Sequence, residues 1–274
     1  MRGAIGVFDS GYGGLTVLKS ISEEMPDYDY IYLGDNARTP YGTRSFDVVY
    51  SYTLQAVKKL FEMGCQLVIL ACNTASAKAL RSIQQNDLPM IDSTKRVLGV
   101  IRPSVEELGL LTQTGHVGIL GTKGTVLSDS YPLEIAKIHS NKGYYVSQQA
   151  CPMWVPIVES DEISTDGADF FVHRDVNLLL DKDEDIDTIL LACTHYPLLF
   201  DTIRKFVPQH IKIVEQGDIV AKSLRNYLDR HVTMDNRCKK SGRIEYYTTE
   251  TVDSFTSKAS LFMGKEIKAS HINL

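Results

Sequence analysis

Several features that mark other classes of protein are missing from this chain of 274 residues. No stretch approaches the roughly 18 consecutive apolar residues of a membrane-spanning helix, and Asp9 arrives too early for the apolar core of a signal peptide. Lysine and arginine number 29 against 34 aspartates and glutamates, so the net charge is −5 and no basic excess points to nucleic acid. These absences predict a cytoplasmic protein that binds neither membranes nor nucleic acid.

Paired cysteine motifs are missing as well. The cysteines are Cys65, Cys72, Cys151, Cys193 and Cys238. None of them forms a Cys-x-x-Cys pair, which argues against a structural zinc site, and their odd number argues against a disulfide framework. A mixed metal site built from Cys72, Cys193 and His195 is conceivable, but it lacks the usual ligand spacing.

Two of the cysteines lie at the same position of a similar eight-residue segment. Residues 67–74 read Leu-Val-Ile-Leu-Ala-Cys-Asn-Thr, and residues 188–195 read Thr-Ile-Leu-Leu-Ala-Cys-Thr-His. Each is an apolar run typical of a buried parallel strand, although such strands are commonly rich in valine, isoleucine and leucine. A cysteine at the corresponding strand end in both halves favours a duplicated domain. Two similar acid/base groups facing one site would suit the inversion of a carbon centre.

The order of the expected elements predicts an α/β fold with parallel sheets. Strands are expected at 4–8, 30–33, 67–72, 89–92, 116–121, 186–192, 212–214 and 243–249, and helices at 15–24, 45–63 and 74–85. We expect a first domain of residues 1–97 plus 210–274, which holds Asp9 and Cys72. A second domain of residues 98–209 holds Thr122 and Cys193.

Both repeated cysteines are expected at the carboxyl ends of parallel strands, where ligands bind in open α/β sheets. Each is also expected just before a helix, whose N-terminal end would lower the pKa of the thiol and bind a carboxylate. A thiolate base beside a carboxylate site suits proton transfer at the carbon next to that carboxylate. Either cysteine alone is more simply a small core residue, whereas the pair favours the functional interpretation.

Other polar residues join this predicted pocket. Asp9 could accept a hydrogen bond from a substrate ammonium or assist Cys72, and Ser10 could bind a carboxylate, although both also fit a plain turn with a helix cap. His195 could be the proton partner of Cys193, and a Cys/His pair is equally typical of cysteine hydrolases. Residues 151–159 read as an apolar loop that ends in a carboxylate, which is more typical of packing than of a site.

Taken together, these motifs resemble those of the glutamate racemases. They are Phe-Asp-Ser-Gly at 8–11, Thr-Pro-Tyr-Gly at 39–42, Ala-Cys-Asn-Thr-Ala at 71–75, Cys-Pro-x-x-Val-Pro-x-Val-Glu at 151–159 and Ala-Cys-Thr-His-Tyr-Pro at 192–197. They cover most of the chain in the family's order. The resemblance implies two pseudosymmetric three-layer α/β/α domains with mainly parallel sheets, the active site between them, and often a homodimer.

The resemblance also implies a reaction and its residues: L- and D-glutamate are interconverted without pyridoxal phosphate, metal or other cofactor, which supplies D-glutamate for peptidoglycan. Cys72 and Cys193 resemble the thiols on the two faces of the substrate, Asp9 the carboxylate that assists the first, and His195 with Glu159 the pair that assists the second. The implied substrate contacts are Asp9, Ser10, Pro40, Tyr41, Gly42, Asn73, Thr74, Thr122, Thr194 and His195. The family often has a second acidic residue after Glu159, where this chain has Ser160.

Three alternatives stay open from the sequence. An aspartate racemase of the same superfamily would share the paired cysteines. A cysteine hydrolase would use Cys193 and His195 and leave Cys72 without a role. A two-domain amino-acid binding protein would hold its ligand without exchanging the α-hydrogen.

Overall fold

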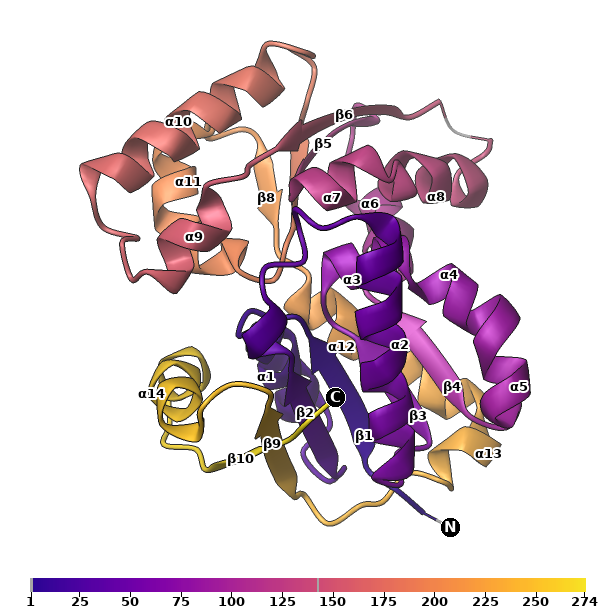
Figure 1. Cartoon of the computed structure of the whole chain (residues 1–274). Coiled ribbons are helices and arrows are strands. Elements are labelled where there is room, and N and C mark those ends of the chain that lie inside the picture. The colour runs from indigo at the N-terminus through magenta and orange to yellow at the C-terminus, as the bar shows by residue number, and fades with distance from the viewer. Residues whose placement is uncertain (1, 142) are drawn as a thin grey trace.

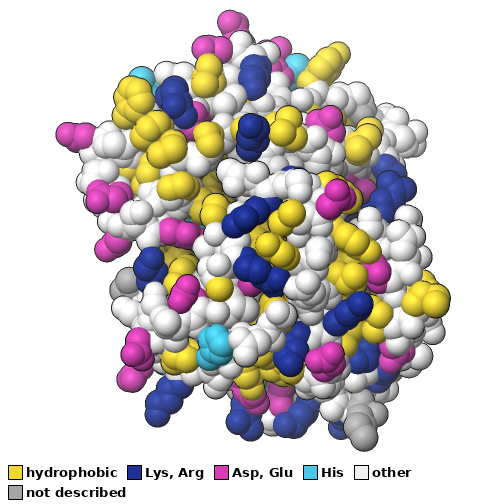
Figure 2. All heavy atoms as spheres, viewed as in Figure 1, with side chains coloured by type: hydrophobic (Ala, Val, Ile, Leu, Met, Phe, Trp, Pro, Cys, Tyr) yellow, Lys and Arg dark blue, Asp and Glu magenta, His cyan; other side chains and the backbone are white. Residues whose placement is uncertain are grey.

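The chain forms two α/β lobes, each built on one parallel sheet (Figure 1). The structure, a computed structural model, describes residues 2–141 and 143–274. The first sheet has the order β10-β9-β2-β1-β3-β4 and the second the order β6-β5-β7-β8. Among the described helices, none is both long and apolar enough to cross a membrane. Figure 2 shows acidic and basic side chains spread over both lobes on one face.

The bounds of the elements largely follow the apolar pattern of the sequence. The strands are β1 (Ile5–Asp9), β2 (Tyr30–Gly34), β3 (Leu67–Leu70), β4 (Arg96–Gly99), β5 (His116–Gly121), β6 (Tyr145–Ala150), β7 (Thr188–Ala192), β8 (Lys212–Val214), β9 (Ile244–Thr248) and β10 (Ala269–His271). The helices of the first half are α1 (Gly14–Glu24), η1 (Asn36–Arg38), α2 (Phe46–Glu62), α3 (Asn73–Lys78), α4 (Leu80–Ser82), η2 (Ile83–Asp87), α5 (Leu88–Asp92) and α6 (Ile101–Leu111). The later helices are α7 (Lys123–Leu127), α8 (Ser130–Ile138), α9 (Trp154–Glu159), α10 (Asp166–Leu180), η3 (Tyr196–Leu199), α11 (Phe200–Phe206), α12 (Gly217–Arg230), α13 (Val232–Asp235) and α14 (Val252–Met263).

The predicted duplication is visible in the strand order. The run β2-β1-β3-β4 in the first sheet corresponds to β6-β5-β7-β8 in the second, and all these pairs are parallel. β3 and β7 therefore occupy equivalent places; Cys193 follows β7 directly, and Cys72 follows β3 after Ala71. The first sheet adds β9 and β10 at one edge. Because parallel strands end at the same edge of a sheet, each lobe presents its polar strand ends on one side.

Each lobe has three layers because both faces of its sheet are apolar. One face of the first sheet packs with α1, α12 and α14, and the other packs with α2 and α3. In the second lobe, α9, α10 and α11 cover one face, while α6 and α8 cover the other (Figure 1). Strands buried on both faces read as continuous apolar runs, which is why they could be located in the sequence.

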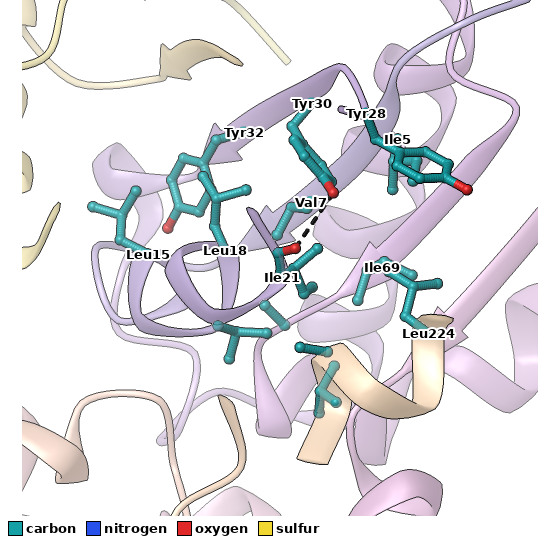
Figure 3. Close-up of a cluster of buried hydrophobic side chains, with 14 of the residues drawn as sticks. Ile5, Val7, Leu15, Leu18, Ile21, Tyr28, Tyr30, Tyr32, Ile69 and Leu224 are labelled. Carbon is teal, nitrogen blue, oxygen red and sulfur yellow. Dashed lines mark hydrogen bonds between the residues drawn. The ribbon is translucent and has the colours of Figure 1, made fainter. Parts of the chain in front are cut away.

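The core under α1 shows how local pattern becomes packing. Leu15, Leu18 and Ile21 recur at helical spacing and point at the strands, where Tyr30 and Tyr32 lie fully buried (Figure 3). The hydroxyl group of Tyr30 reaches past this core to carbonyl oxygens at the end of α1, 2.8 Å from that of Met25 and 3.4 Å from that of Ile21. Burial of these side chains fixes α1, and with it the glycine-rich turn that precedes it.

Two element predictions are wrong. Residues 89–92, expected as a strand, belong to the helix α5, and the fourth strand of the sheet is β4 at 96–99 instead. Pro89 sits in the first turn of α5, where its missing N–H costs nothing, and Met90 is 86% exposed, so this segment is no buried strand. Residues 151–159, expected as a loop, contain the helix α9.

The expected domain limits also need correction. A limit between residues 97 and 98 falls inside β4, and β8 at 212–214 pairs with β7 in the second sheet, although residues 210–274 were expected in the first domain. The chain passes between the lobes at two strand-to-helix junctions, from β4 to α6 and from β8 to α12. No linker separates the elements there, so composition does not mark the crossings. We propose domain limits at these two junctions.

Candidate active site

A cavity of about 80 Å³ lies between the strand ends of the two lobes. The sequence-predicted residues that line it are Ser10, Pro40, Tyr41, Gly42, Cys72, Asn73, Thr74, Thr122, Cys193, Thr194 and His195. They come from segments that follow β1, β2, β3, β5 and β7. Folding therefore gathers loops that lie far apart in the sequence around one space. Asp9 and Glu159 do not line the cavity and lie behind residues that do.

The first thiol is held at the start of α3. Cys72 is the N-cap residue, and its Sγ accepts a hydrogen bond from the Ala75 N–H at 3.4 Å. The same sulfur lies 3.5 Å from the hydroxyl oxygen of Ser10. Burial, and then the nearby Asp9 carboxyl group, raise the pKa of Cys72 to about 12. The prediction of a lowered pKa at Cys72 is wrong: the Ala75 N–H at the helix end lowers the pKa, but the loss of water outweighs it.

The second thiol has a different partner. Cys193 Sγ lies 3.9 Å from Nδ1 of His195, and Nε2 of the same ring lies 3.1 Å from Glu159 Oε1. Burial alone would lower the pKa of His195, but its hydrogen bonds to Cys193 and Glu159 raise the pKa to about 10. The imidazole ring is therefore positively charged at neutral pH. The prediction of a helix directly after Cys193 is wrong, since the next element, η3, begins at Tyr196.

Asp9 is fully buried behind the wall of the cavity. Its carboxylate oxygens accept hydrogen bonds from the Gly11 N–H at 2.9 Å and from the Thr194 hydroxyl group at 3.4 Å. Burial raises the pKa of Asp9 above its ordinary value, so this carboxyl group takes up a proton more readily than one in water. The expected contact between Asp9 and a substrate ammonium is not favoured, because Asp9 is outside the lining.

The family model described as Asp/Glu/Hydantoin racemase matches residues 5–224. The chain belongs to this racemase family. A glutamate racemase from Ruegeria sp. (strain TM1040) is 38% identical over 275 residues, which cover 96% of this chain and 98% of the relative.

Solved structures of the same family have the same fold. A glutamate racemase isoform from Bacillus anthracis matches with a TM-score of 0.89 at 31% identity, covering 99% of this chain and 97% of the other. A glutamate racemase from Francisella tularensis, solved in complex with D-glutamate, matches with a TM-score of 0.84 at 30% identity, covering 100% and 97%.

Sequence reasoning missed part of this racemase's cavity wall. Cys151, Pro152, Val155 and Pro156 line the cavity from the segment that was interpreted as packing. Glu159, the last residue of helix α9, lies within hydrogen-bond distance of His195. Only the motif shared with the family signalled this role, because an apolar segment of this kind is also typical of a core.

A second missed group holds Tyr41 in place. The hydroxyl group of Tyr41 donates to Oδ2 of Asp35, an oxygen that also accepts from Arg38 Nε at 2.7 Å. Oδ1 of Asp35 accepts from the Thr249 hydroxyl group at 2.9 Å. Asp35 is fully buried, and its partners come from two distant parts of the chain, so no local pattern reveals it.

The conceivable mixed metal site is not supported by the arrangement. Among residues 2–141 and 143–274, the one group of three His, Cys, Asp or Glu ligand atoms within 4.8 Å of one another is His116, Asp183 and Asp185. These residues lie outside the cavity lining, and Nδ1 of His116 is 2.8 Å from Asp183 Oδ2. Cys72, Cys193 and His195 do not form such a group.

His195 makes a pH-dependent contribution to stability. Its ordinary pKa is 6.5 and its folded value is about 10, so the folded state binds this proton more tightly. The stabilisation is complete below pH 6.5 and is lost as the pH rises through about 10. The difference in free energy of unfolding between wild type and His195→Asn should shrink over this range, with a slope of at most about 1.4 kcal/mol per pH unit in urea denaturation. A difference that stays constant would contradict this assignment.

Proposed function

We propose that this protein interconverts L- and D-glutamate by proton transfer at Cα. The observation that carries the proposal is that Cys72 and Cys193, which follow equivalent strands of the two lobes, line one cavity. Racemisation must remove a proton from one face of the carbon and return one to the opposite face. Two thiols supplied by two lobes meet that requirement. Relatives named glutamate racemase, which match over the full length of the chain, support glutamate over aspartate as the substrate.

The charges around the two thiols differ, and this sets their starting roles. His195 places a positive charge beside Cys193, while burial and the Asp9 carboxyl group raise the pKa of Cys72 to about 12. We therefore assign Cys72, whose thiol keeps its proton, as the acid and Cys193 as the base for the enantiomer whose α-hydrogen faces Cys193. After one turnover the protonation states are exchanged, so the opposite enantiomer is processed by the same steps in reverse.

The α-hydrogen of an amino acid is weakly acidic, so the intermediate needs electrostatic stabilisation. The cavity offers the hydroxyl groups of Ser10, Thr74 and Thr122 to the substrate's carboxylates. Both thiols are nearly excluded from water, at 6% exposure for Cys72 and 5% for Cys193. A dry site strengthens each of these interactions.

A cysteine hydrolase is the second candidate, because one observation favours it. The imidazole ring of His195 contacts the Cys193 thiol through one nitrogen and the Glu159 carboxylate through the other. In a hydrolase these three groups would serve as nucleophile, base and orienting group. That mechanism gives Cys72 no role. Trapping of an acyl group on Cys193, with full activity in Cys72→Ser, would support the hydrolase over the racemase.

The decisive experiment is incubation of the protein with L-glutamate in heavy water. We expect the circular dichroism signal of L-glutamate to decay to zero, with one deuterium gained at Cα by mass spectrometry, and the same from D-glutamate. L-Aspartate, run in parallel, should react far more slowly. Binding of glutamate without deuterium gain would refute the racemase and indicate a binding protein.

The proposal extends to D-glutamate supply for peptidoglycan, a cytoplasmic location and a homodimer. All five cysteines are buried and unbridged, as expected where thiols stay reduced. Leu110, Leu127 and Phe170 are large apolar side chains exposed on the second lobe, and they offer surface to a second copy. Analytical ultracentrifugation should show a dimer, and a monomer at all concentrations would refute that part of the proposal.

A further inference from the structure

Four buried polar side chains form a hydrogen-bonded network where the chain crosses between the lobes. Ser104 lies in the first turn of α6, just after the first crossing, and Gln216 precedes α12, just after the second. Tyr131 comes from α8 of the second lobe, and Asn73 follows Cys72 in the first lobe. Each of the four is at most 4% exposed. The network therefore joins both crossings to the segment that holds the first thiol.

The donors and acceptors of this network fit together in one arrangement. Gln216 Nε2 donates to Ser104 Oγ at 2.7 Å and to the Tyr131 hydroxyl group at 2.8 Å. That hydroxyl group donates to Asn73 Oδ1 at 2.6 Å, and Asn73 Nδ2 donates to Gln216 Oε1 at 2.6 Å. The Ser104 hydroxyl group donates its own hydrogen bond to the Val100 carbonyl oxygen at 2.8 Å. Turning one amide group over would set two NH₂ groups or two oxygens against each other. Turning both together would set Gln216 Oε1 against the Ser104 oxygen, whose proton goes to Val100, so both orientations are fixed.

The segment that follows Cys72 is thereby tied to the second lobe at two successive residues. Asn73 is tied through Gln216 and Tyr131, and the hydroxyl group of Thr74 lies 2.9 Å from that of Thr122. Apolar packing between lobes is not directional and tolerates small shifts. Hydrogen bonds with fixed partners do not, which makes this network suited to holding one thiol at a set place relative to the other lobe.

We propose that Gln216 is a positioning residue that acts through Asn73 to set the place of Cys72 relative to the second lobe. This inference rests on the proposed racemisation. Gln216 does not line the cavity, so it has no direct contact with a bound amino acid. Loss of its amide group leaves Asn73 Nδ2 without this acceptor, so that Tyr131 alone holds the Asn73 amide, and disconnects the 72–74 segment from both crossings. Misplacement of a reacting group by about 1 Å lowers the rate about 100-fold.

Gln216→Leu tests the proposal, with Gln66→Leu as the matched control. Gln66 is also a buried glutamine, at 8% exposure, but it precedes β3 at the end opposite Cys72 and bonds to the Gly64 carbonyl oxygen. We expect Gln216→Leu to lower kcat about 10- to 100-fold with little change in KM. Gln66→Leu should keep the wild-type kcat.

Isotope effects separate positioning from a general loss of structure. With glutamate deuterated at Cα, slower transfer at Cys72 raises the primary isotope effect for the enantiomer that Cys72 deprotonates. For the opposite enantiomer, reprotonation by Cys72 limits the rate, so the substrate isotope effect falls and the solvent isotope effect rises. A general loss of folded structure would lower kcat without changing the substrate isotope effects of the two enantiomers in opposite directions. Thermal unfolding of each variant shows whether it is folded.

Equal isotope effects in both directions, or a kcat like that of Gln66→Leu, would overturn the proposal. If Gln216→Leu does not fold, Tyr131→Phe removes one hydroxyl group of the network and is judged by the same readouts. Wild-type protein that fails to racemise glutamate refutes the proposed function together with this inference. Wild-type protein that racemises, alongside an unaffected Gln216→Leu, refutes the role of Gln216 alone.

Discussion

Cys72→Ser and Cys193→Ser are each expected to lower glutamate racemisation by about 100- to 10,000-fold, the usual loss for a missing proton-transfer group. A serine hydroxyl group is far less acidic than a thiol, so it neither forms the base nor returns the proton at a useful rate. Both thiols line the cavity, and the proposed mechanism uses both in each direction. Turnover is measured by circular dichroism from each enantiomer.

The two variants should also differ from each other. In each of them the remaining thiol faces one enantiomer, so any residual release of α-deuterium should come from opposite enantiomers in the two proteins. Cys238→Ser is the matched control, since Cys238 is buried away from the cavity and its sulfur donates to the Met234 carbonyl oxygen at 3.4 Å, a bond that serine can keep. Near wild-type turnover in Cys72→Ser or Cys193→Ser would refute the two-thiol mechanism.

Gly13→Ala is expected to lower turnover about 100-fold, although it adds a single methyl group. A Cβ atom at Gly13 would lie 2.3 Å from the Thr194 hydroxyl oxygen and 2.5 Å from Nδ1 of His195. The ring of His195 is held between Cys193 and Glu159, so it yields only by giving up one of these contacts. The free energy of unfolding should fall by about 1–3 kcal/mol, as for other overpacked sites.

Gly167→Ala is the control for this methyl group. Gly167 lies in the first turn of α10, is exposed, and would place its Cβ 3.5 Å from the Thr165 hydroxyl oxygen, an ordinary contact. Its kcat and thermal stability should match those of the wild type. Gly13→Ala with more than half of the wild-type kcat would show that the strand-end loops of the two lobes can separate without cost to the reaction.

Much of the fold could be predicted because its strands are buried on both faces. The runs that became β1, β2, β3, β5 and β7 are continuous and apolar, and such runs are visible in the sequence. β4 and α5 could not be separated in this way. β4 is only partly buried at the sheet edge, so its apolar signal is weak, and the neighbouring Pro-Met-Ile run has the more strand-like sequence.

The candidate site was predicted unevenly for a similar reason. Cys72, Cys193 and Ser10 stand directly after buried strands, so their place at the sheet edge follows from the sequence. Asp35 bonds to Thr249, 214 residues away, and Tyr131 and Gln216 bond to Asn73, 58 and 143 residues away in the chain. Such contacts leave no local pattern, and no spacing rule identifies them.

The sequence by itself located the strands β1, β2, β3, β5 and β7, and it indicated that two halves are alike and that a thiol stands at the same point in each. These are properties of local composition and repetition, which do not depend on how distant segments meet. Only the tertiary structure decided that the Cys72 thiol is held as an acid, that Asp9 stands behind the cavity wall, and that His195 carries a positive charge between Cys193 and Glu159. Protonation depends on burial and on neighbours from other segments, and folding alone supplies both.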